Sequence, residues 1–199
     1  MSYNLKKEGK FNYVEIGEGR PIIILHGLMG GLSNFDGVAK FFSKNGYMVV
    51  LPELPLYSMS LLNTNVKSFS NYLNDFIEYK GYEDVILVGN SLGGHVGLYH
   101  TKLFPAKVKA LVITGSSGLY ESAMGSGYTK RSDYEVMKAK AQEVFYDPEV
   151  ATKTIVDEVY KTVNDRNKLI KILAIAKSAI RHNMAKDLPG ITTPTCVVW

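Results

Sequence analysis

Residues 89–93 join a segment with a strand pattern to a segment with a helix pattern. This junction constrains the fold more than any other feature of the sequence. Residues 84–88 form a short run rich in β-branched side chains, typical of a strand buried on both faces. Apolar residues then recur at helical spacing from Leu92 to Leu103, and Pro105 ends the pattern. A strand that passes directly into a helix predicts a β-α unit of a parallel sheet.

The same alternation of strand and helix patterns runs through the first 118 residues. Strands are expected at residues 11–16, 21–25, 47–51, 84–88 and 108–114, and helices at residues 33–44, 66–80 and 92–104. We therefore expect an α/β fold with a mainly parallel sheet and helices on both of its faces.

A helical segment interrupts this alternation. From about residue 132 to residue 181 the apolar spacing is helical, and residues 195–199 then form a further strand pattern, expected to be buried. Because no strand separates these helices, we expect them to form a cap over the sheet. The predicted division is an α/β core at residues 1–118, a helical cap at 119–188 and a return to the core at 189–199.

Charge divides along the same boundary. Residues 130–186 contain 12 Lys and Arg against 8 Asp and Glu, whereas the rest of the chain contains 11 of each. The net charge of +4 therefore belongs to the helical segment. A solvated helical surface is the simpler interpretation, and a lid that attracts anionic substrates is the alternative.

Composition and motif content exclude several classes of protein. Hydrophobic residues make up 46% of the chain, which suits a globular core and excludes disorder. The sequence has no dense basic cluster for nucleic acid, no apolar run long enough for a membrane span and no signal-peptide pattern. Cys196 is the single cysteine, which excludes an intrachain disulfide and favours the cytoplasm. We expect no metal and no cofactor, because His95 and His100 do not share a helical face and no P-loop or dinucleotide motif is present.

Ser91 is the candidate nucleophile. It stands in a G-x-S-x-G pattern, which becomes specific where it follows a buried strand and opens a helix. On so sharp a turn the backbone is strained and the hydroxyl projects above the sheet, while Gly89 and Gly93 leave room where a Cβ would clash. Free N–H groups at the helix start favour an anion beside the serine. The alternative is a tight turn with a capping serine and no chemistry.

A glycine-rich loop beginning at His26 follows the second expected strand. Such a loop can turn a backbone N–H towards the serine, and acyl transfer needs two donors for its oxyanion. We predict the N–H groups of Leu28 and Leu92 as these donors, with His26 and Gly27 supporting the loop. His26 precedes the nucleophile in the chain, so a structural role is preferred over that of catalytic base.

Both features together resemble the α/β-hydrolase superfamily, over nearly the whole chain. His26 and Gly27 resemble its oxyanion loop, residues 89–94 its nucleophile elbow, and residues 192–199 the strand that leads to its catalytic acid. The resemblance implies a hydrolase that attacks an ester, a thioester or a C–C bond next to a carbonyl. Its substrate would be a small molecule with an apolar part, and no metal or organic cofactor is implied. Serine at the nucleophile position argues against the dehalogenase and epoxide-hydrolase branches, which attack through a carboxylate, whereas cofactor-free haloperoxidases share the same triad.

The family pattern also requires an acid and a histidine. The triad runs nucleophile, acid, histidine along the chain, and the last two lie beyond the strand that here ends at Trp199. As substitutes we considered His95, His100 and His182, which we expect to be structural, and Glu121, which comes too late in its loop. We therefore expect the 199 residues to be a piece of a longer hydrolase, with an uncovered sheet edge that promotes self-association.

Two alternatives to an active enzyme remain open. Related folds act as small-molecule receptors with little or no turnover, and a fragment without acid and histidine would be catalytically inactive. Covalent labelling of Ser91 together with sustained release of product would separate an enzyme from both.

Overall fold

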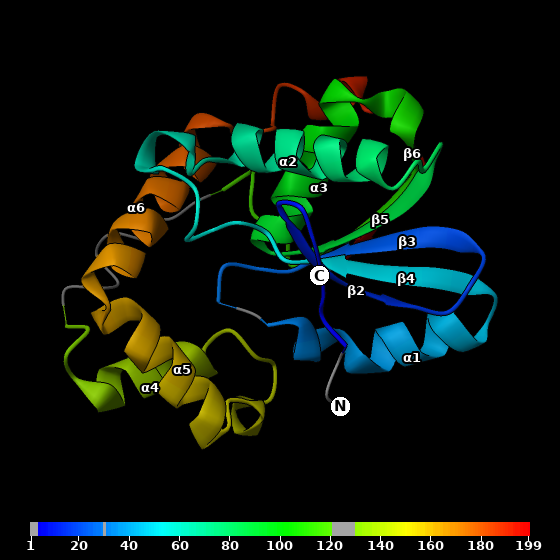
Figure 1. Ribbon diagram of the computed structural model, residues 1–199. Helices are drawn as coiled ribbons and strands as arrows, with labels where there is room; N and C mark the ends of the chain where they lie inside the picture. Colours follow the sequence, from blue (N-terminus) through cyan, green and yellow to red (C-terminus); the bar gives the residue numbers. More distant parts are fainter. Residues whose placement is uncertain (1–3, 30, 121–129) are drawn as a thin grey trace.

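The computed structural model describes residues 4–29, 31–120 and 130–199, and within them seven strands form one sheet (Figure 1). The strands are β1 (Lys6–Glu8), β2 (Phe11–Ile16), β3 (Arg20–Leu25), β4 (Tyr47–Pro52), β5 (Val85–Asn90), β6 (Val108–Thr114) and β7 (Thr195–Val198). Their order across the sheet is β1-β2-β4-β3-β5-β6-β7. β2 is antiparallel to both of its neighbours, and all pairings from β4 to β7 are parallel. The prediction of a mainly parallel sheet is confirmed.

Helices cover both faces of this sheet, as β3 illustrates. Ile22 and Ile24 pack in one hydrophobic cluster with α1 (Asp36–Lys44), whereas Ile23 and Leu25 pack in another with α2 (Val66–Tyr79) and α3 (Leu92–Leu103). All four side chains are buried. The continuous apolar run in the sequence therefore reflects a strand covered on both sides, and Figure 1 shows α1 on the opposite face from α2 and α3.

Three α-helices of the described chain lie between β6 and β7: α4 (Tyr134–Gln142), α5 (Lys153–Asn164) and α6 (Arg166–Arg181). Aspartates begin two of them, because the Asp133 carboxylate accepts hydrogen bonds from the first N–H groups of α4 and the Asp165 carboxylate does the same for α6. The predicted helical insertion before the last strand is confirmed. In Figure 1 the insertion lies beyond the carboxyl ends of β3 and β4.

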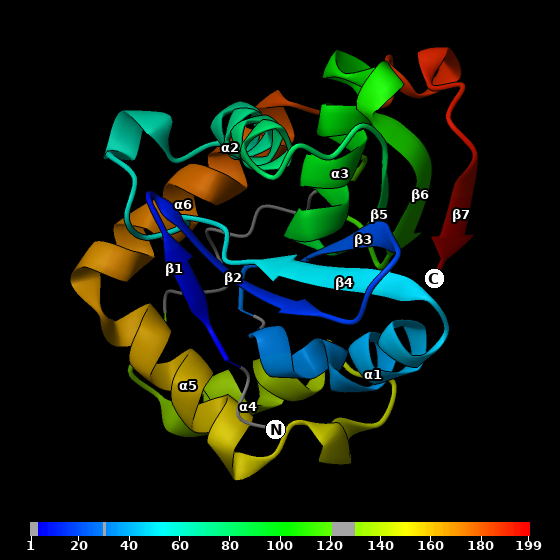
Figure 2. The ribbon, with the colours of Figure 1, turned by 45° about the vertical axis from the view of Figure 1, so that its right-hand side comes forward.

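β7 exists where the sequence pattern predicted a strand, and its exposure agrees with the uncovered sheet edge expected at this end of the chain, whereas the burial that its apolar pattern indicated is wrong. All four of its residues are exposed, with Val197 at 60% and Val198 at 52%. The reason is its place in the sheet: in the described chain β7 pairs with β6 alone and forms the edge opposite β1 (Figure 2). Apolar β-branched residues favour a strand wherever it lies, so the pattern alone does not distinguish an edge strand from a buried one. The uncovered edge is expected from the resemblance to the α/β-hydrolase family and not from this pattern.

Candidate active site

Ser91 has the most unusual backbone in the described chain. It is the single non-glycine residue there with a positive φ, at 53°, and it forms the junction between β5 and α3. Such a conformation costs on the order of 1–3 kcal/mol and persists only where the surroundings enforce it. Here the Ser91 N–H donates to Thr114 O (3.1 Å), and the Ser91 carbonyl accepts hydrogen bonds from the N–H groups of His95 (3.2 Å) and Ser117 (3.2 Å).

The glycines around Ser91 lie where no side chain fits. A Cβ built on Gly89 would lie 2.5 Å from Gly93 O, and one on Gly93 would lie 2.1 Å from Leu25 O. Both distances are far inside van der Waals contact, and both partners are backbone atoms. Glycine at position 93 therefore lets α3 pack against the end of β3, and glycine at position 89 lets the first turn of α3 lie directly against β5.

The loop after β3 is fixed by His26, whose side chain is 8% exposed. Its Nδ1 lies 2.8 Å from Gly27 O, and its Nε2 accepts the N–H of Leu54 at 2.9 Å. Since a carbonyl only accepts, Nδ1 carries the hydrogen and the ring is neutral. Burial lowers the pKa of His26 below its ordinary value. Both ring nitrogens are used by the backbone, which leaves neither to take a proton from Ser91.

The loop held by His26 lies against the nucleophile turn. A Cβ on Gly27 would lie 3.3 Å from Ser91 Cβ, so the two segments are in contact. Leu28 follows in the same loop, and Leu92 is the first residue of α3, whose N–H has no partner within the helix. The two predicted oxyanion donors thus belong to the two segments that meet at Ser91.

The three histidines that follow Ser91 contact other parts of the molecule. His95 Nε2 lies 2.9 Å from His182 O, and His100 Nδ1 lies 3.2 Å from Ser70 O, with both side chains fully buried. Burial lowers the pKa of His100 to about 4. His182 Nδ1 lies 2.9 Å from Ser178 O. These contacts agree with the structural roles expected for the three rings, while Glu121 lies outside the described residues.

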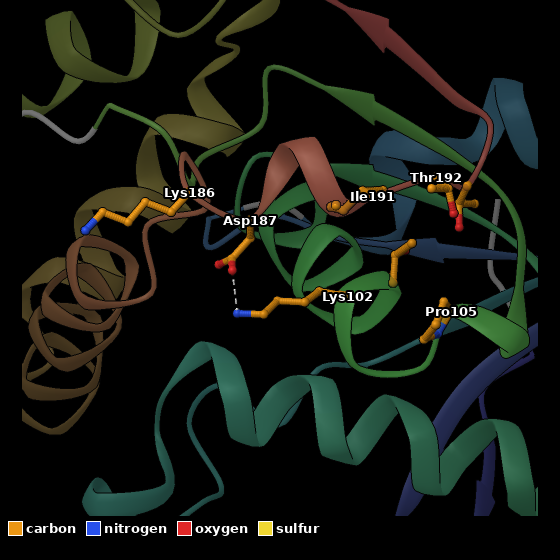
Figure 3. Close-up of a pocket in the computed structure, with 9 residues that line it drawn as sticks. Lys102, Pro105, Lys186, Asp187, Ile191 and Thr192 are labelled. Atoms are coloured by element: carbon orange, nitrogen blue, oxygen red, sulfur yellow. Dashed lines mark ion pairs between the residues drawn. The ribbon is translucent and has the colours of Figure 1, made fainter.

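Two cavities differ in their relation to Ser91. One of about 290 Å³ lies against the His26 loop, and the other, of about 300 Å³, lies at the far end of α3. Lys102, Asp187 and neighbouring residues line the second cavity, with an ion pair of 2.8 Å between those two side chains (Figure 3). Because α3 has 12 residues, about 18 Å of helix separates this cavity from Ser91. The first cavity is therefore the candidate substrate pocket; it is lined by His26, Leu28, Gly31, Leu32, Glu53, Leu54, Leu56 and Tyr57.

The described residues also bear on two other kinds of site. No group of His, Cys, Asp and Glu side chains in them is arranged to hold a metal ion. Likewise, none of the helices that the structure describes is both long and apolar enough to cross a membrane.

Comparison with known proteins agrees with the strand–serine–helix geometry. Residues 20–163 match the family model described as the alpha/beta hydrolase fold. The chain belongs to the α/β-hydrolase family. A solved relative, an alpha/beta hydrolase enzyme from the metagenome of sediments of the Mar Chica lagoon, Morocco, is 59% identical to this α/β-hydrolase chain. The match has a TM-score of 0.79 and covers 98% of this chain and 74% of that one.

Curated relatives of this α/β-hydrolase chain have different substrates. Lipase 1 of Psychrobacter immobilis is 26% identical over all of this chain and 67% of its own length. A 2-hydroxy-6-oxo-6-phenylhexa-2,4-dienoate hydrolase of Comamonas testosteroni is 24% identical over 94% of this chain and 73% of its own. The chain spans only 51% of a third relative, the dihydrolipoyllysine-residue acetyltransferase component of the acetoin cleaving system of Pseudomonas putida, at 24% identity.

Proposed function

We propose that the protein is a serine hydrolase that cleaves an ester, a thioester or a C–C bond next to a carbonyl through an acyl-enzyme on Ser91. The observation that carries this proposal is the strained φ of 53° at Ser91, in the turn between β5 and α3. Strain that the surrounding hydrogen bonds maintain marks functional positions. The lipase and C–C hydrolase among the relatives support the same reaction class.

In the proposed reaction Ser91 Oγ attacks the carbonyl carbon of the substrate while a general base takes its proton. The N–H groups of Leu28 and Leu92 hold the resulting oxyanion. Collapse of this intermediate breaks the bond to the leaving group, which receives the proton, and water then hydrolyses the acyl-enzyme. The family order of nucleophile, acid and histidine assigns the base and its orienting acid to positions after β7.

We propose a small-molecule substrate with an apolar part. Four leucines contribute to the cavity of about 290 Å³ beside the His26 loop, and Glu53 is its single formally charged residue. The helical insertion extends beyond the same ends of the strands from which Ser91 emerges (Figure 1). We accordingly propose residues 119–188 as a cap over the pocket and residues 1–118 and 189–199 as the core. The lone, exposed Cys196 fits a reducing compartment, and we propose the cytoplasm.

A small-molecule receptor of the same fold is the second candidate. It is favoured by the contacts of His95, His100 and His182, whose rings bond to the backbone carbonyls of His182, Ser70 and Ser178. A receptor would bind at the same cavity and release no product.

Labelling of the serine separates the two functions. In an enzyme form that includes the positions after β7, a fluorophosphonate should modify Ser91 with a stoichiometry of one, and p-nitrophenyl esters should be turned over repeatedly. Ser91→Ala serves as the control and should lose both signals. Binding of an ester without release of nitrophenol would favour the receptor, and labelling at another residue would refute the role of Ser91.

A further inference from the structure

His95 links the nucleophile turn to the end of the helical insertion. Its N–H donates to the Ser91 carbonyl at 3.2 Å, which places it one helical turn after the nucleophile. Its side chain is fully buried, and its Nε2 lies 2.9 Å from His182 O, the residue that follows α6. Since a carbonyl oxygen only accepts, Nε2 carries the hydrogen of this bond.

The loop after β6 completes this connection. A Cβ on Gly118 would lie 2.9 Å from the His95 ring, so the ring packs directly on the backbone of that loop. The Met184 N–H donates to Gly118 O at 2.7 Å, and the neighbouring Ser117 N–H donates to the Ser91 carbonyl at 3.2 Å. We call His95, Gly118, His182 and Met184 the α6 joint. Its members come from α3, from the loop after β6 and from the segment that follows α6.

We propose that His95 is a positioning residue, which fixes the downstream end of the helical insertion relative to Ser91 through its hydrogen bond to His182 O. The donor ring is fully buried, and a buried donor without an acceptor is unfavourable, so the ring keeps the end of α6 in one place. α6 is also held near this end by the Val66 N–H, which donates to Ser178 Oγ at 2.9 Å. Without the His95 bond the end of α6 would still contact α2 through Ser178 and the loop after β6 through Met184, but it would lose its buried hydrogen bond to the helix that follows Ser91.

The functional part of this inference rests on the proposed function of Ser91. If residues 119–188 cover the pocket, loosening of the α6 joint affects the substrates that reach the insertion. Long acyl chains should then bind less well, whereas the chemical step on a short ester should change little. The effect belongs in KM for the long substrate and not in kcat for the short one.

His100 provides a matched control. It lies on the same helix, is equally buried and also bonds to a backbone carbonyl, but that carbonyl belongs to Ser70 on α2. Replacing either histidine by leucine removes one buried ring and its hydrogen bond to a backbone carbonyl. The two variants should therefore have a similar loss in the free energy of unfolding. His95→Leu should increase the mobility of α6, and His100→Leu should increase that of α2.

Hydrogen–deuterium exchange of the whole chain tests the proposal without requiring turnover. His95→Leu should speed exchange in residues 134–181 by about fivefold to tenfold, the effect of one lost hydrogen bond. His95→Gln, whose amide nitrogen can donate to His182 O, should restore slow exchange. His100→Leu should speed exchange in α2 and leave residues 134–181 at the parent rate.

Kinetics with p-nitrophenyl octanoate and acetate form the second arm. His95→Leu should raise KM for octanoate several-fold and leave kcat for acetate within about twofold, and the Gln variant should restore KM for octanoate. If His95→Leu does not fold, His95→Asn, whose amide is too short to reach His182 O, replaces it. Equal exchange in residues 134–181 for the His95 and His100 variants would overturn the proposal. Absence of Ser91-dependent turnover in a parent form that includes the positions after β7 would instead refute the proposed function, and the exchange data would still decide the α6 joint.

Discussion

Gly93 of α3 lies so close to the carbonyl oxygen of Leu25 that a Cβ built on it would be only 2.1 Å away. Leu25 is the last residue of β3, directly before His26. This approach seats the nucleophile helix on the strand that leads into the candidate oxyanion loop. The two halves of the site are thus held together by backbone contact.

Replacement of Gly93 by alanine should therefore destabilise the fold severely. The new methyl group would meet a carbonyl at the end of a central strand, which cannot move aside as a side chain can. We expect a loss of about 3 kcal/mol or more in the free energy of unfolding, measured by urea titration. Gly37→Ala is the control: a Cβ at Gly37 meets nothing within 4 Å, and its site lies in α1, so stability should hold or rise. Equal stability of the two variants would contradict the steric argument.

Two substitutions at Ser91 should distinguish the effect of backbone strain on stability from the effect of the hydroxyl on catalysis. Ser91→Ala and Ser91→Gly both remove the hydroxyl, so each should lower kcat by on the order of 10³-fold or more in an active form of the enzyme. Glycine also accepts a positive φ, and Ser91→Gly should therefore be more stable than Ser91→Ala by about 1 kcal/mol. Thermal unfolding of the two variants measures this difference. An alanine variant as stable as the glycine variant would mean that the turn carries no strain.

Stability should fall on acidification because of His100. Its pKa is about 4 in the folded chain, below the ordinary value of 6.5, so between these values the unfolded chain binds a proton that the folded chain does not. Its contribution is complete above pH 6.5 and is lost as pH falls towards 4, by about 3 kcal/mol in total. Urea titrations from pH 7 to pH 4 should show a shallower decline for His100→Leu than for the parent. Parallel declines would show that the ring titrates alike in both states.

The exposed edge at β7 should promote self-association. Its unpaired backbone and the exposed Val197 form a surface on which a second strand can add. Sedimentation velocity over a range of concentrations should reveal oligomers that Val197→Lys suppresses, because a charge on an edge strand opposes pairing. Leu62→Lys removes a side chain that is 91% exposed on another part of the surface and should leave association unchanged. A monomer at every concentration would contradict this prediction.

The nucleophile turn could be predicted from sequence because its geometry is local. Ser91 lies shortly after a run of β-branched residues and directly before a helix pattern. The flanking glycines are required because a Cβ at either position would clash with backbone atoms. β3 could be predicted for a similar reason, since a strand covered on both faces must be apolar throughout.

The remaining features depend on the packing of distant segments. His95 and His182 are 87 positions apart, and no periodicity indicates that the ring of one bonds to the carbonyl of the other. The exposure of β7 depends on the order of strands in the sheet, which side-chain composition does not encode. In both cases the local sequence pattern predicted the secondary-structure element correctly but not the segments that pack against it.

The hydrogen bonds of Ser91 have a consequence for protein engineering. Its N–H is bonded to β6, and its carbonyl is bonded to α3 and to the loop that follows β6. Copying residues 89–93 into the strand–helix junction of another scaffold would reproduce the sequence of the motif. It would not supply the hydrogen-bond partners that impose a φ of 53° on the serine. A transplant that is meant to keep this backbone conformation must therefore carry the neighbouring strand and its loop, and the smallest portable unit of the turn is β5, α3 and β6 together.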